Sequence, residues 1–411
     1  MKLLFVAPSS YHLNGPEAFV NAKHVKLLCD MGHEVDLIYR NKRNLANHYS
    51  SSSQSFFFSK VSLVREVKVE TDYSIKTILR HIKTFFKTGY VYKASDWAYP
   101  AIKTCEELIK TTHYDYVFTK DYPSEIVGVY LAKKYGIRWI PTWNDPYMWK
   151  KYPAPYGEGT TYKESFFYKK LIKAIGRYSY KNIFPSTRLR DYMLKYMYGM
   201  KEDSCVIMPH IMLDNYQMTD NTNKDIHPEL RIIHAGALGK ERDPENLFKA
   251  LRLLLNDNPD ARIRVTLMGV DERSRNGHMN DLITRYSLDD IVEFIPPVSY
   301  ADSFNVMSGY DVCLIIEAAC EVGIFLPSKV ADYLQIDKPV FSISPKVGVL
   351  RDLYKKRVVG YCANVTDVND IKDQLVALLD DYDKGKLKHS KDKGCFSEME
   401  VKQIHISKIL V

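Results

Sequence analysis

Apolar runs alternate with segments of helical spacing along the first half of the chain. Residues 3–7 are all apolar, which is typical of a buried strand, and residues 19–31 carry apolar side chains three and four positions apart. After Gly32 a second strand is expected at 34–39, so the chain opens with a βαβ unit. The same alternation predicts later elements in this half: strands at 114–119 and 138–142, with a helix at 124–134 between them.

The second half repeats this order of elements. It follows a polar stretch at 219–228 and opens with a strand at 230–235, a helix at 244–255 and a strand at 262–268. Three further short strands are expected at 291–295, 312–316 and 339–343. The two series predict an α/β fold with two consecutive doubly wound, Rossmann-like domains.

The composition agrees with two folded domains. A chain of 411 residues exceeds what one hydrophobic core usually serves, and 45% hydrophobic with 26% charged residues excludes a disordered, collagen-like or coiled-coil protein. The seven cysteines are scattered without a C-x-x-C pair, which indicates neither a disulfide framework nor a zinc site. Because no apolar run approaches the ~18 residues of a spanning helix and no cleavage-site pattern follows the first strand, we expect a cytoplasmic protein.

Positive charge is concentrated in the first half. Residues 1–210 hold 32 lysine and arginine against 19 aspartate and glutamate residues, a net charge of +13, whereas the remainder has a net charge of -5. Within this half, residues 74–87 and 166–180 interleave apolar and basic residues, as a helix lying on a membrane surface does. An ordinary helix that packs its apolar side on a core has the same pattern. No aromatic and basic signature of a nucleic-acid module accompanies them, so an anionic membrane surface is the expected partner and nucleic acid is not.

The loops after the strands carry the candidate chemistry, since ligands of open α/β sheets bind beyond the carboxyl ends of the strands. The first loop has one glycine, Gly15, and lacks the Gly-x-Gly-x-x-Gly of a dinucleotide site; no P-loop occurs either. In the second half, Gly236 lies in a loop with Lys240 and Arg242, where a phosphate would meet the next helix. Lys329 is expected in the first turn of a later helix.

These loops resemble those of retaining GT-B glycosyltransferases of the family 4 type, which build capsule, O-antigen and related surface polysaccharides. The nucleotide-sugar half of that family is similar to IIHAGALGKERDPENLFKAL and FLPSKVADYLQIDKPVFSI. Its acceptor half is similar to GPEAFVNAKHVKLLCDMGHEVDLIY, YDYVFTKDYPSEIVG and WNDPYMW, and its interdomain segment to VIMPHIMLD. The resemblance implies a GT-B fold with an acceptor-side domain at 1–212, a nucleotide-sugar domain at 213–396 and a last helix, 397–411, that returns to the first domain.

The resemblance also assigns roles to residues that bind the donor. It places Arg242 and Lys329 against the donor diphosphate and Asp332, where the family usually has Glu, against the ribose hydroxyls. Ala237 stands where an arginine is common, so Lys240 would supply that charge. Gly236 matches a loop glycine of the family, and Gly323 and Ser328 are further donor-side candidates.

Two further positions depart from the family. Ile324 stands where the family's paired-glutamate motif has its first Glu, so Glu321 is the expected replacement. On the acceptor side Gly15 matches a loop glycine, and Lys120 stands in the loop where many relatives carry a histidine. Gly15 and Lys120 are therefore the acceptor-side candidates.

The expected mechanism needs no metal, cofactor or protein nucleophile. Breaking the glycosidic bond to a nucleoside diphosphate builds negative charge on the phosphate, which two fixed cations would stabilise, and that phosphate can take the acceptor's proton. The only Asp-x-Asp spacing, Asp381 to Asp383, lies near the end of the chain, which disfavours a metal-dependent enzyme. Asp145 is the candidate catalytic carboxylate for the acceptor, a glycan or lipid-linked hydroxyl; a turn cap explains it equally well.

Two other functions use the same donor pocket. A GT-B nucleotide-sugar epimerase would need carboxylates and a histidine facing the sugar ring, which the sequence does not locate. A non-catalytic nucleotide-sugar-binding subunit is favoured by Ala237 and Ile324. The pattern of residues leaves both open.

Overall fold

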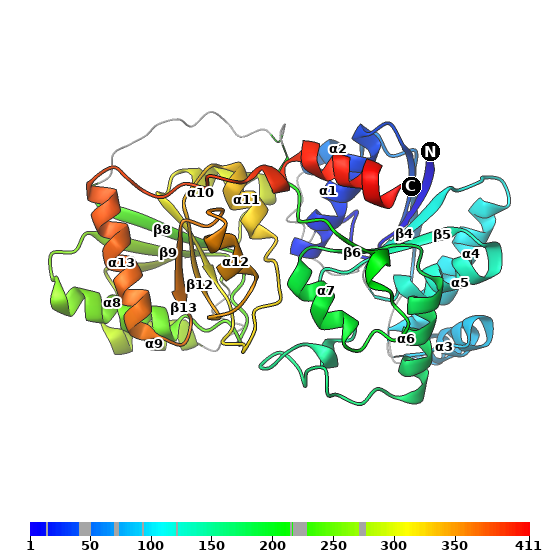
Figure 1. Ribbon diagram of the computed structural model, residues 1–411, viewed down its shortest axis with the longest axis horizontal. Helices are drawn as coiled ribbons and strands as arrows, with labels where there is room; N and C mark the ends of the chain where they lie inside the picture. Colours follow the sequence, from blue (N-terminus) through cyan, green and yellow to red (C-terminus); the bar gives the residue numbers. More distant parts are fainter. Residues whose placement is uncertain are drawn as a thin grey trace. The chain divides into compact units, whose positions relative to one another are not determined.

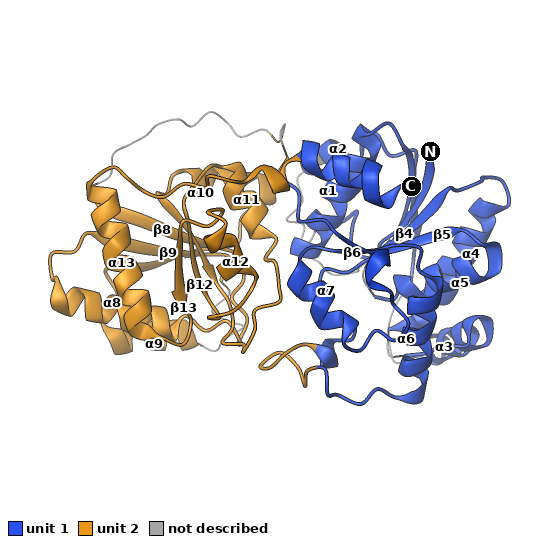
Figure 2. Cartoon of the chain, viewed as in Figure 1, with its two compact units in different colours: residues 1–151, 160–211, 398–411 blue, residues 152–159, 212–397 orange. Residues whose placement is uncertain are grey.

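The computed structural model describes residues 1–13, 15–40, 51–69, 74–92, 94–120, 122–213, 216, 228–270 and 277–411. Over these residues the chain divides into two compact units, each with its own parallel sheet (Figure 2). Unit 1 comprises residues 1–151, 160–211 and 398–411, and unit 2 comprises residues 152–159 and 212–397. Most of the polar stretch expected at 219–228 lies outside the described residues.

Unit 1 is built on a sheet of seven parallel strands. They are β1 (Lys2–Val6), β2 (Glu34–Arg40), β3 (Leu63–Val67), β4 (Tyr116–Lys120), β5 (Arg138–Thr142), β6 (Asn182–Phe184) and β7 (Cys205–Ile207). Their order is β3-β2-β1-β4-β5-β6-β7, so the winding reverses between β1 and β4. The central strands are buried along their length, with Leu3, Leu4 and Phe5 fully inaccessible, because helices cover both faces of a parallel sheet.

The helices of unit 1 come from both ends of the chain. They are α1 (Pro16–Asp30), α2 (Ser51–Phe58), α3 (Ile75–Thr88), α4 (Ala98–Ile109), α5 (Ser124–Tyr135), α6 (Phe166–Tyr178), α7 (Thr187–Leu194) and α14 (Glu398–Ile404). Helices α3 to α6 pack on one another in chain order, and α1 packs on α2. The final segment, α14 with a π-helical turn at His405–Ile409, belongs to unit 1 although residues 212–397 before it belong to unit 2 (Figure 1).

Unit 2 has a six-stranded parallel sheet. Its strands are β8 (Leu230–Ala235), β9 (Ile263–Met268), β10 (Val292–Ile295), β11 (Val312–Ile316), β12 (Val340–Ser344) and β13 (Tyr361–Asn364), in the order β10-β9-β8-β11-β12-β13. Its helices are α8 (Glu245–Asp257), α9 (His278–Tyr286), α10 (Tyr300–Ser308), α11 (Lys329–Gln335), α12 (Val349–Lys355) and α13 (Val368–Asp383). Figure 1 shows α8, α9 and α13 on one side of this sheet and α10, α11 and α12 on the other. The core lies under the first group, where Phe248, Leu251 and Leu375 are buried against the strands.

The structure confirms the expected α/β class and its two doubly wound domains. Every strand and helix predicted above is present, with ends that differ by no more than three residues when the π-helical turn at His405–Ile409 is counted with α14. Several elements were not predicted, among them β6 and β7, which are only three residues long and too short to show a period. In the part of the chain that the structure describes, no helix has the length and apolar character needed to cross a membrane.

Candidate functional site

The loops that follow the strands of unit 2 meet at one edge of its sheet, because parallel strands all end at the same edge. Three of these loops hold the residues expected to bind a donor or lie against them. They are the loop 236–244 after β8, the loop at 269–270 after β9, and the loop 317–328 between β11 and α11.

Two glycines allow the loops after β8 and β9 to approach closely. Gly236 has a φ of 110° and Gly269 a φ of 82°, a region that favours glycine. A β-carbon at Gly269 would lie 3.3 Å from Gly236 Cα, and a β-carbon at Gly236 would lie 3.2 Å from Lys329 Nζ. The missing side chain at Gly236 therefore lets the Lys329 ammonium lie directly against the backbone of the first loop.

His234, the buried fifth residue of β8, positions the Lys329 ammonium. His234 Nδ1 lies 3.1 Å from the Leu314 carbonyl oxygen and donates to it, which leaves His234 Nε2 to accept from Lys329 Nζ at 3.2 Å. Burial, with the Lys329 cation beside it, holds the pKa of His234 well below its ordinary value. The ring is therefore neutral and able to accept.

Lys329 and Arg242 act on each other electrostatically. Burial and the Arg242 cation lower the pKa of Lys329 to about 7, although the Asp332 carboxylate opposes this shift. Two cations held near each other in a partly buried place repel, and an anion bound between them would relieve that repulsion. The arrangement is the one that a diphosphate group would fit.

Tyr156 holds the Arg242 side chain. Arg242 Nε donates to the Tyr156 hydroxyl at 2.9 Å. Tyr156 belongs to the short segment 152–159 that is part of unit 2, and its ring contacts that of Phe325 at a centroid distance of 5.4 Å. This partner could not be found from the sequence, because 86 positions separate the two residues of the hydrogen bond.

Glu317 is a buried carboxyl that the sequence reasoning missed. It directly follows β11, is 5% exposed, and its Oε2 has no hydrogen-bond partner among the described residues. Burial raises the pKa of Glu317 to about 7, although Arg242 acts in the opposite direction. A β-carbon at Gly323 would lie 3.3 Å from Glu317 Oε2, so this glycine and the carboxyl are neighbours.

The remaining donor-side candidates differ in their surroundings. Asp332 is half-buried, and its Oδ1 accepts a hydrogen bond from the Tyr300 hydroxyl at 2.7 Å. Ser328 is the residue before α11, where its side chain makes no capping hydrogen bond. Lys240 and Glu321 are both exposed. Glu317 is buried, whereas Glu321, the replacement expected from the sequence, lies in the same loop with an exposed side chain.

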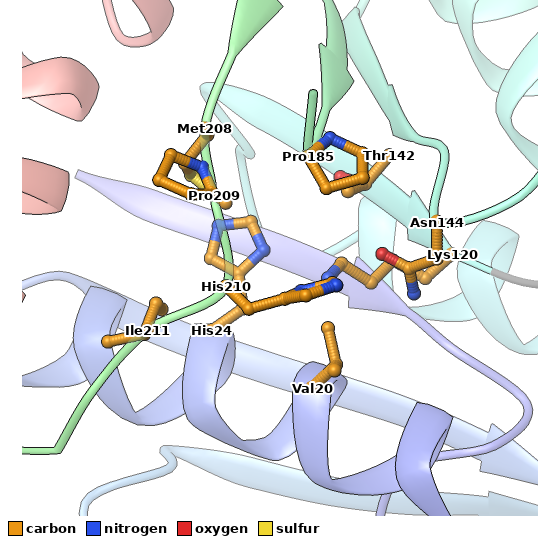
Figure 3. A pocket seen from close by; sticks show the side chains of 10 residues that line it. All are labelled: Val20, His24, Lys120, Thr142, Asn144, Pro185, Met208, Pro209, His210 and Ile211. Carbon is orange, nitrogen blue, oxygen red and sulfur yellow. The ribbon is translucent and has the colours of Figure 1, made fainter. Parts of the chain in front are cut away.

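The three acceptor-side candidates lie in unit 1. Gly15 precedes α1 with a φ of 144°, and Asp145 is exposed in the loop after β5. Lys120, the last residue of β4, is only 2% exposed and lines a small pocket (Figure 3). That pocket includes Asn144 but neither Gly15 nor Asp145.

The sequence matches no family model and no curated protein. Solved structures match nearly the whole chain. Sucrose-phosphate synthase from Thermosynechococcus elongatus is 15% identical, with a TM-score of 0.65 over 98% of this chain and 94% of that one. Anabaena Alr3699/HepE in complex with UDP and glucose is 13% identical, with a TM-score of 0.66 over 98% and 97%. A putative UDP-N-acetylglucosamine 2-epimerase from Listeria monocytogenes is 12% identical, with a TM-score of 0.57 over 99% and 95%.

The two parallel sheets of this chain, with their flanking helices, match the two Rossmann-like domains of the first two of these structures. The chain has the GT-B fold. At such low identity the likeness shows the GT-B fold and leaves the chemistry to the residues themselves.

The GT-B fold brings some of the expected residues together and separates others. Within unit 2, Gly236, Lys329, Arg242 and Asp332 form one cluster, joined by Glu317. Glu317 could have been found from the rule that the first residue after a buried strand faces the ligand edge, since 312–316 was a predicted strand. In unit 1 Lys120 lies in a pocket of its own. Within the described ranges, no three His, Cys, Asp or Glu side chains are arranged to hold a metal ion.

Proposed function

We propose that this chain is a retaining glycosyltransferase of the family 4 type, which moves a sugar from a nucleoside-diphosphate sugar to a glycan or lipid-linked acceptor in surface-polysaccharide biosynthesis. The proposal rests mainly on the pair Arg242 and Lys329 at the ligand edge of unit 2, held by Tyr156 and His234. The structural neighbour Alr3699/HepE, which was solved with UDP and glucose, supports this class of donor.

The proposed reaction uses the two cations to stabilise the leaving diphosphate. The bond from the sugar's anomeric carbon to the phosphate oxygen breaks, and the acceptor oxygen bonds to the same face of that carbon. The acceptor's proton passes to the departing phosphate oxygen, so neither a protein nucleophile nor a metal or other cofactor takes part. Arg242 and Lys329 bind the charge that develops on the phosphate, and removing either weakens binding by about 1.5–3 kcal/mol.

The other cluster residues would position the donor. Asp332 accepts hydrogen bonds from the ribose hydroxyls, with Tyr300 fixing its carboxylate. Glu317, with an unpartnered Oε2 in a buried place, accepts a hydrogen bond from a sugar hydroxyl. Lys240 supports the diphosphate from the exposed side, while Asp145 orients the acceptor hydroxyl.

Calorimetry with UDP and GDP tests the donor assignment. We expect Arg242→Ala and Lys329→Ala each to weaken binding of the preferred nucleotide about tenfold or more. Arg285→Ala serves as the matched control, because Arg285 is an exposed cation on α9 of the same unit. Unchanged affinity in both variants, with folding intact, would remove the two cations from the site.

Product analysis tests the reaction itself. Incubation with a panel of nucleotide sugars and lipid-linked or glycan acceptors, with and without EDTA, should give a glycoside whose anomeric configuration by NMR matches that of the donor. An epimerase is the second candidate, favoured by the Listeria monocytogenes neighbour. It would convert UDP-N-acetylglucosamine to its 2-epimer without any acceptor. A chain that binds nucleotide but gives neither product would be a binding subunit.

We also propose that unit 1 docks on an anionic membrane surface, where a lipid-linked acceptor would be found. In α3 the residues buried against the protein are Thr77 and Thr84, while the large apolar side chains face outward. Phe85 of α3 contacts Phe167 of α6 edge-on at 5.7 Å, so the exposed apolar residues of both helices form one surface. This surface, the α3–α6 patch, consists of Ile75, Ile78, Leu79, Ile82, Phe86, Phe166 and Phe167.

The α3–α6 patch argues against the alternative of an ordinary helix packed on a core. Ile75 is 75% exposed and Phe86 82% exposed, whereas a core-packing helix would bury such side chains. Exposed lysines accompany the patch on α3 and α6, and each contributes about 1 kcal/mol near an anionic bilayer. These are Lys76, Lys83, Lys169, Lys170 and Lys173. Apolar insertion with surrounding cations favours an anionic lipid surface over a neutral protein partner.

Co-sedimentation with phosphatidylglycerol vesicles tests this docking. The apolar variant is Ile78→Ser, Ile82→Ser and Phe86→Ser, and the charge variant is Lys76→Glu with Lys83→Glu. Both leave Arg80 and Lys87 in place, since these contact Asp96 and Glu106 within the fold. We expect wild-type binding at low salt and loss in both variants, with Val376→Ser on α13 of unit 2 as control for loss of an exposed apolar residue. If the wild-type protein does not bind anionic vesicles at low salt, the docking is refuted.

A further inference from the structure

The pocket of unit 1 lies at the ligand edge of its sheet. Lys120 and Thr142 are the last residues of β4 and β5, and Pro185 and Met208 directly follow β6 and β7. The pocket therefore spans the ends of four neighbouring strands. Helix α1 closes the opposite side with Val20 and His24 (Figure 3).

The polar groups that line this pocket include several hydrogen-bond donors and, among the described residues, no carboxylate. Among its ten lining residues Lys120 contributes an ammonium group, Thr142 a hydroxyl and Asn144 an amide. His24 and His210 add imidazoles. The other lining residues are apolar: Val20, Pro185, Met208, Pro209 and Ile211. A small group with negative charge and several acceptor oxygens matches this lining.

The hydroxyl of Thr142 is a buried polar group at this pocket. Its side chain is 6% exposed, and its Oγ1 has no hydrogen-bond partner among the described residues. A buried hydroxyl without a partner is costly, so it is expected to be satisfied by something that enters the pocket. Figure 3 draws Thr142 beside Pro185, with Lys120 and Asn144 between these residues and Val20 in the view.

His24 keeps the remaining wall of the pocket neutral. Its Nε2 lies 3.0 Å from His405 Nε2, so one ring donates to the other. Burial, followed by the nearby Lys120 cation, lowers the pKa of His24 well below its ordinary value. Lys120 therefore contributes a positive charge to the lining, and a cation there favours an anion.

We propose that this pocket binds an oxyanion, a phosphoryl or carboxyl group, that the acceptor substrate carries next to the hydroxyl to be glycosylated. The assignment rests on the proposed function, which makes unit 1 the acceptor side. Lys120 pairs with the oxyanion and the Thr142 hydroxyl donates to it. An acceptor that has this group is thereby selected over a neutral sugar.

Calorimetry on the full chain tests the subsite directly. Arg242→Gln with Lys329→Met is the background, because these changes remove the cations of unit 2 that would also bind phosphate. The probes are methyl phosphate, a methyl glycoside of a uronic acid and the neutral methyl glucoside. We expect one equivalent of phosphate or of uronate to bind, whichever the acceptor carries, and no binding of the neutral glycoside.

Variants of the pocket then identify where the probe binds. We expect Lys120→Met to weaken binding about tenfold or more, and Thr142→Val to weaken it several-fold, whereas Thr142→Ser, which keeps the hydroxyl, binds as the background does. Imidazole NMR signals of His24 and His210 should shift on titration. These shifts and the Thr142 pair decide the question even if Lys120→Met does not fold.

The measurements distinguish a failure of the oxyanion subsite from a failure of the donor assignment. No saturable binding of either oxyanion, or binding that is equal in Thr142→Val and Thr142→Ser with unmoved imidazole signals, overturns the subsite. Wild-type binding of UDP is measured separately. If UDP binds and the oxyanions do not, only the subsite fails; if the oxyanions bind as expected and no nucleotide does, only the donor assignment fails.

Discussion

Lys329 is the residue that couples nucleotide binding to pH. In the free protein its pKa is lowered to about 7, because burial and Arg242 disfavour its charge. A bound diphosphate favours the ammonium and raises that pKa, so binding above pH 7 takes up a proton. We expect UDP affinity to fall by up to about tenfold per pH unit above 7. Calorimetry in two buffers of different ionisation enthalpy measures the uptake.

The control for this linkage is Lys329→Met. It should bind more weakly but with little proton uptake at about pH 8, because the titrating group is gone. Equal uptake in wild type and Lys329→Met would show that another group carries the linkage.

We expect the buried carboxyl of Glu317 to lower the stability of the protein while it serves in binding. The pKa of Glu317 in the folded protein, about 7, lies above its ordinary value of 4.5. The protonated carboxyl therefore favours the folded state at low pH, and this contribution to the free energy of unfolding is lost as the pH rises through that interval. Glu317→Gln removes this loss, and we expect the variant to be more stable than wild type at about pH 8, by up to about 3 kcal/mol. The advantage should vanish near pH 4. Urea unfolding of both proteins, followed by circular dichroism at the two pH values, measures the difference.

The same substitution should weaken binding of a nucleotide sugar while leaving the nucleoside diphosphate unaffected, if Glu317 contacts the sugar. Glu321→Gln, in an exposed position of the same loop, tests the other candidate carboxyl in the same assay. A stability difference that does not change with pH would mean that Glu317 titrates normally.

At the scale of elements, α5 and β5 fit together through one glycine. A β-carbon at Gly128 would lie 2.0 Å from Nε1 of the Trp139 ring, which is fully buried and donates to Thr119 Oγ1 at 2.8 Å. Alanine is favoured over glycine in a helix by about 1 kcal/mol, but overpacking costs about 1–3 kcal/mol or more. We expect Gly128→Ala to lower the free energy of unfolding of unit 1.

Tryptophan fluorescence measures the unfolding of unit 1, because all four tryptophans lie within residues 97–149 of this unit. Gly394→Ala is the control, since its β-carbon would meet nothing within 4 Å. A Gly128→Ala midpoint in urea equal to that of wild type would show that Trp139 can move aside.

At the scale of the whole molecule, the last residues of the chain are tied to unit 1 by a histidine pair. His24 of α1 and His405 after α14 lie 3.0 Å apart between Nε2 atoms, and burial lowers the pKa of His405 to about 3. Because both folded pKa values are depressed, the unfolded chain takes up protons first, and stability is lost as pH falls from about 6.5 toward 3. We expect unit 1 to lose up to about 1.4 kcal/mol per pH unit for each histidine.

His405→Gln tests this linkage, because its amide can still bond to His24 but does not titrate. Its free energy of unfolding, followed by tryptophan fluorescence between about pH 7 and 4.5, should depend less on pH than that of wild type. The difference should equal the contribution of one histidine. Identical pH profiles would contradict the assignment. Comparing the two proteins cancels the opposite contribution of buried carboxyls such as Glu125, whose pKa is raised to about 7.

The sequence by itself determined the alternation of strands and helices for the elements with a clear period, because the spacing of apolar residues is a local signal that a short window contains. It also placed Gly236, Arg242 and Lys329 after predicted strands, at the edge where ligands of such sheets bind. Their roles at a diphosphate stay predictions of the resemblance and of the geometry around them. Strands as short as β6, with three residues, gave no such signal.

Only the tertiary structure decided which side chains are buried together and which side of a helix faces water. The pattern of α3 predicts an amphipathic helix, yet nothing local reveals that its threonines face the protein and its isoleucines face outward. Glu317, Tyr156 and the pocket at Lys120 depend on contacts between segments far apart in the chain. Burial and pKa shifts arise from such contacts, so a local pattern of residues does not contain them.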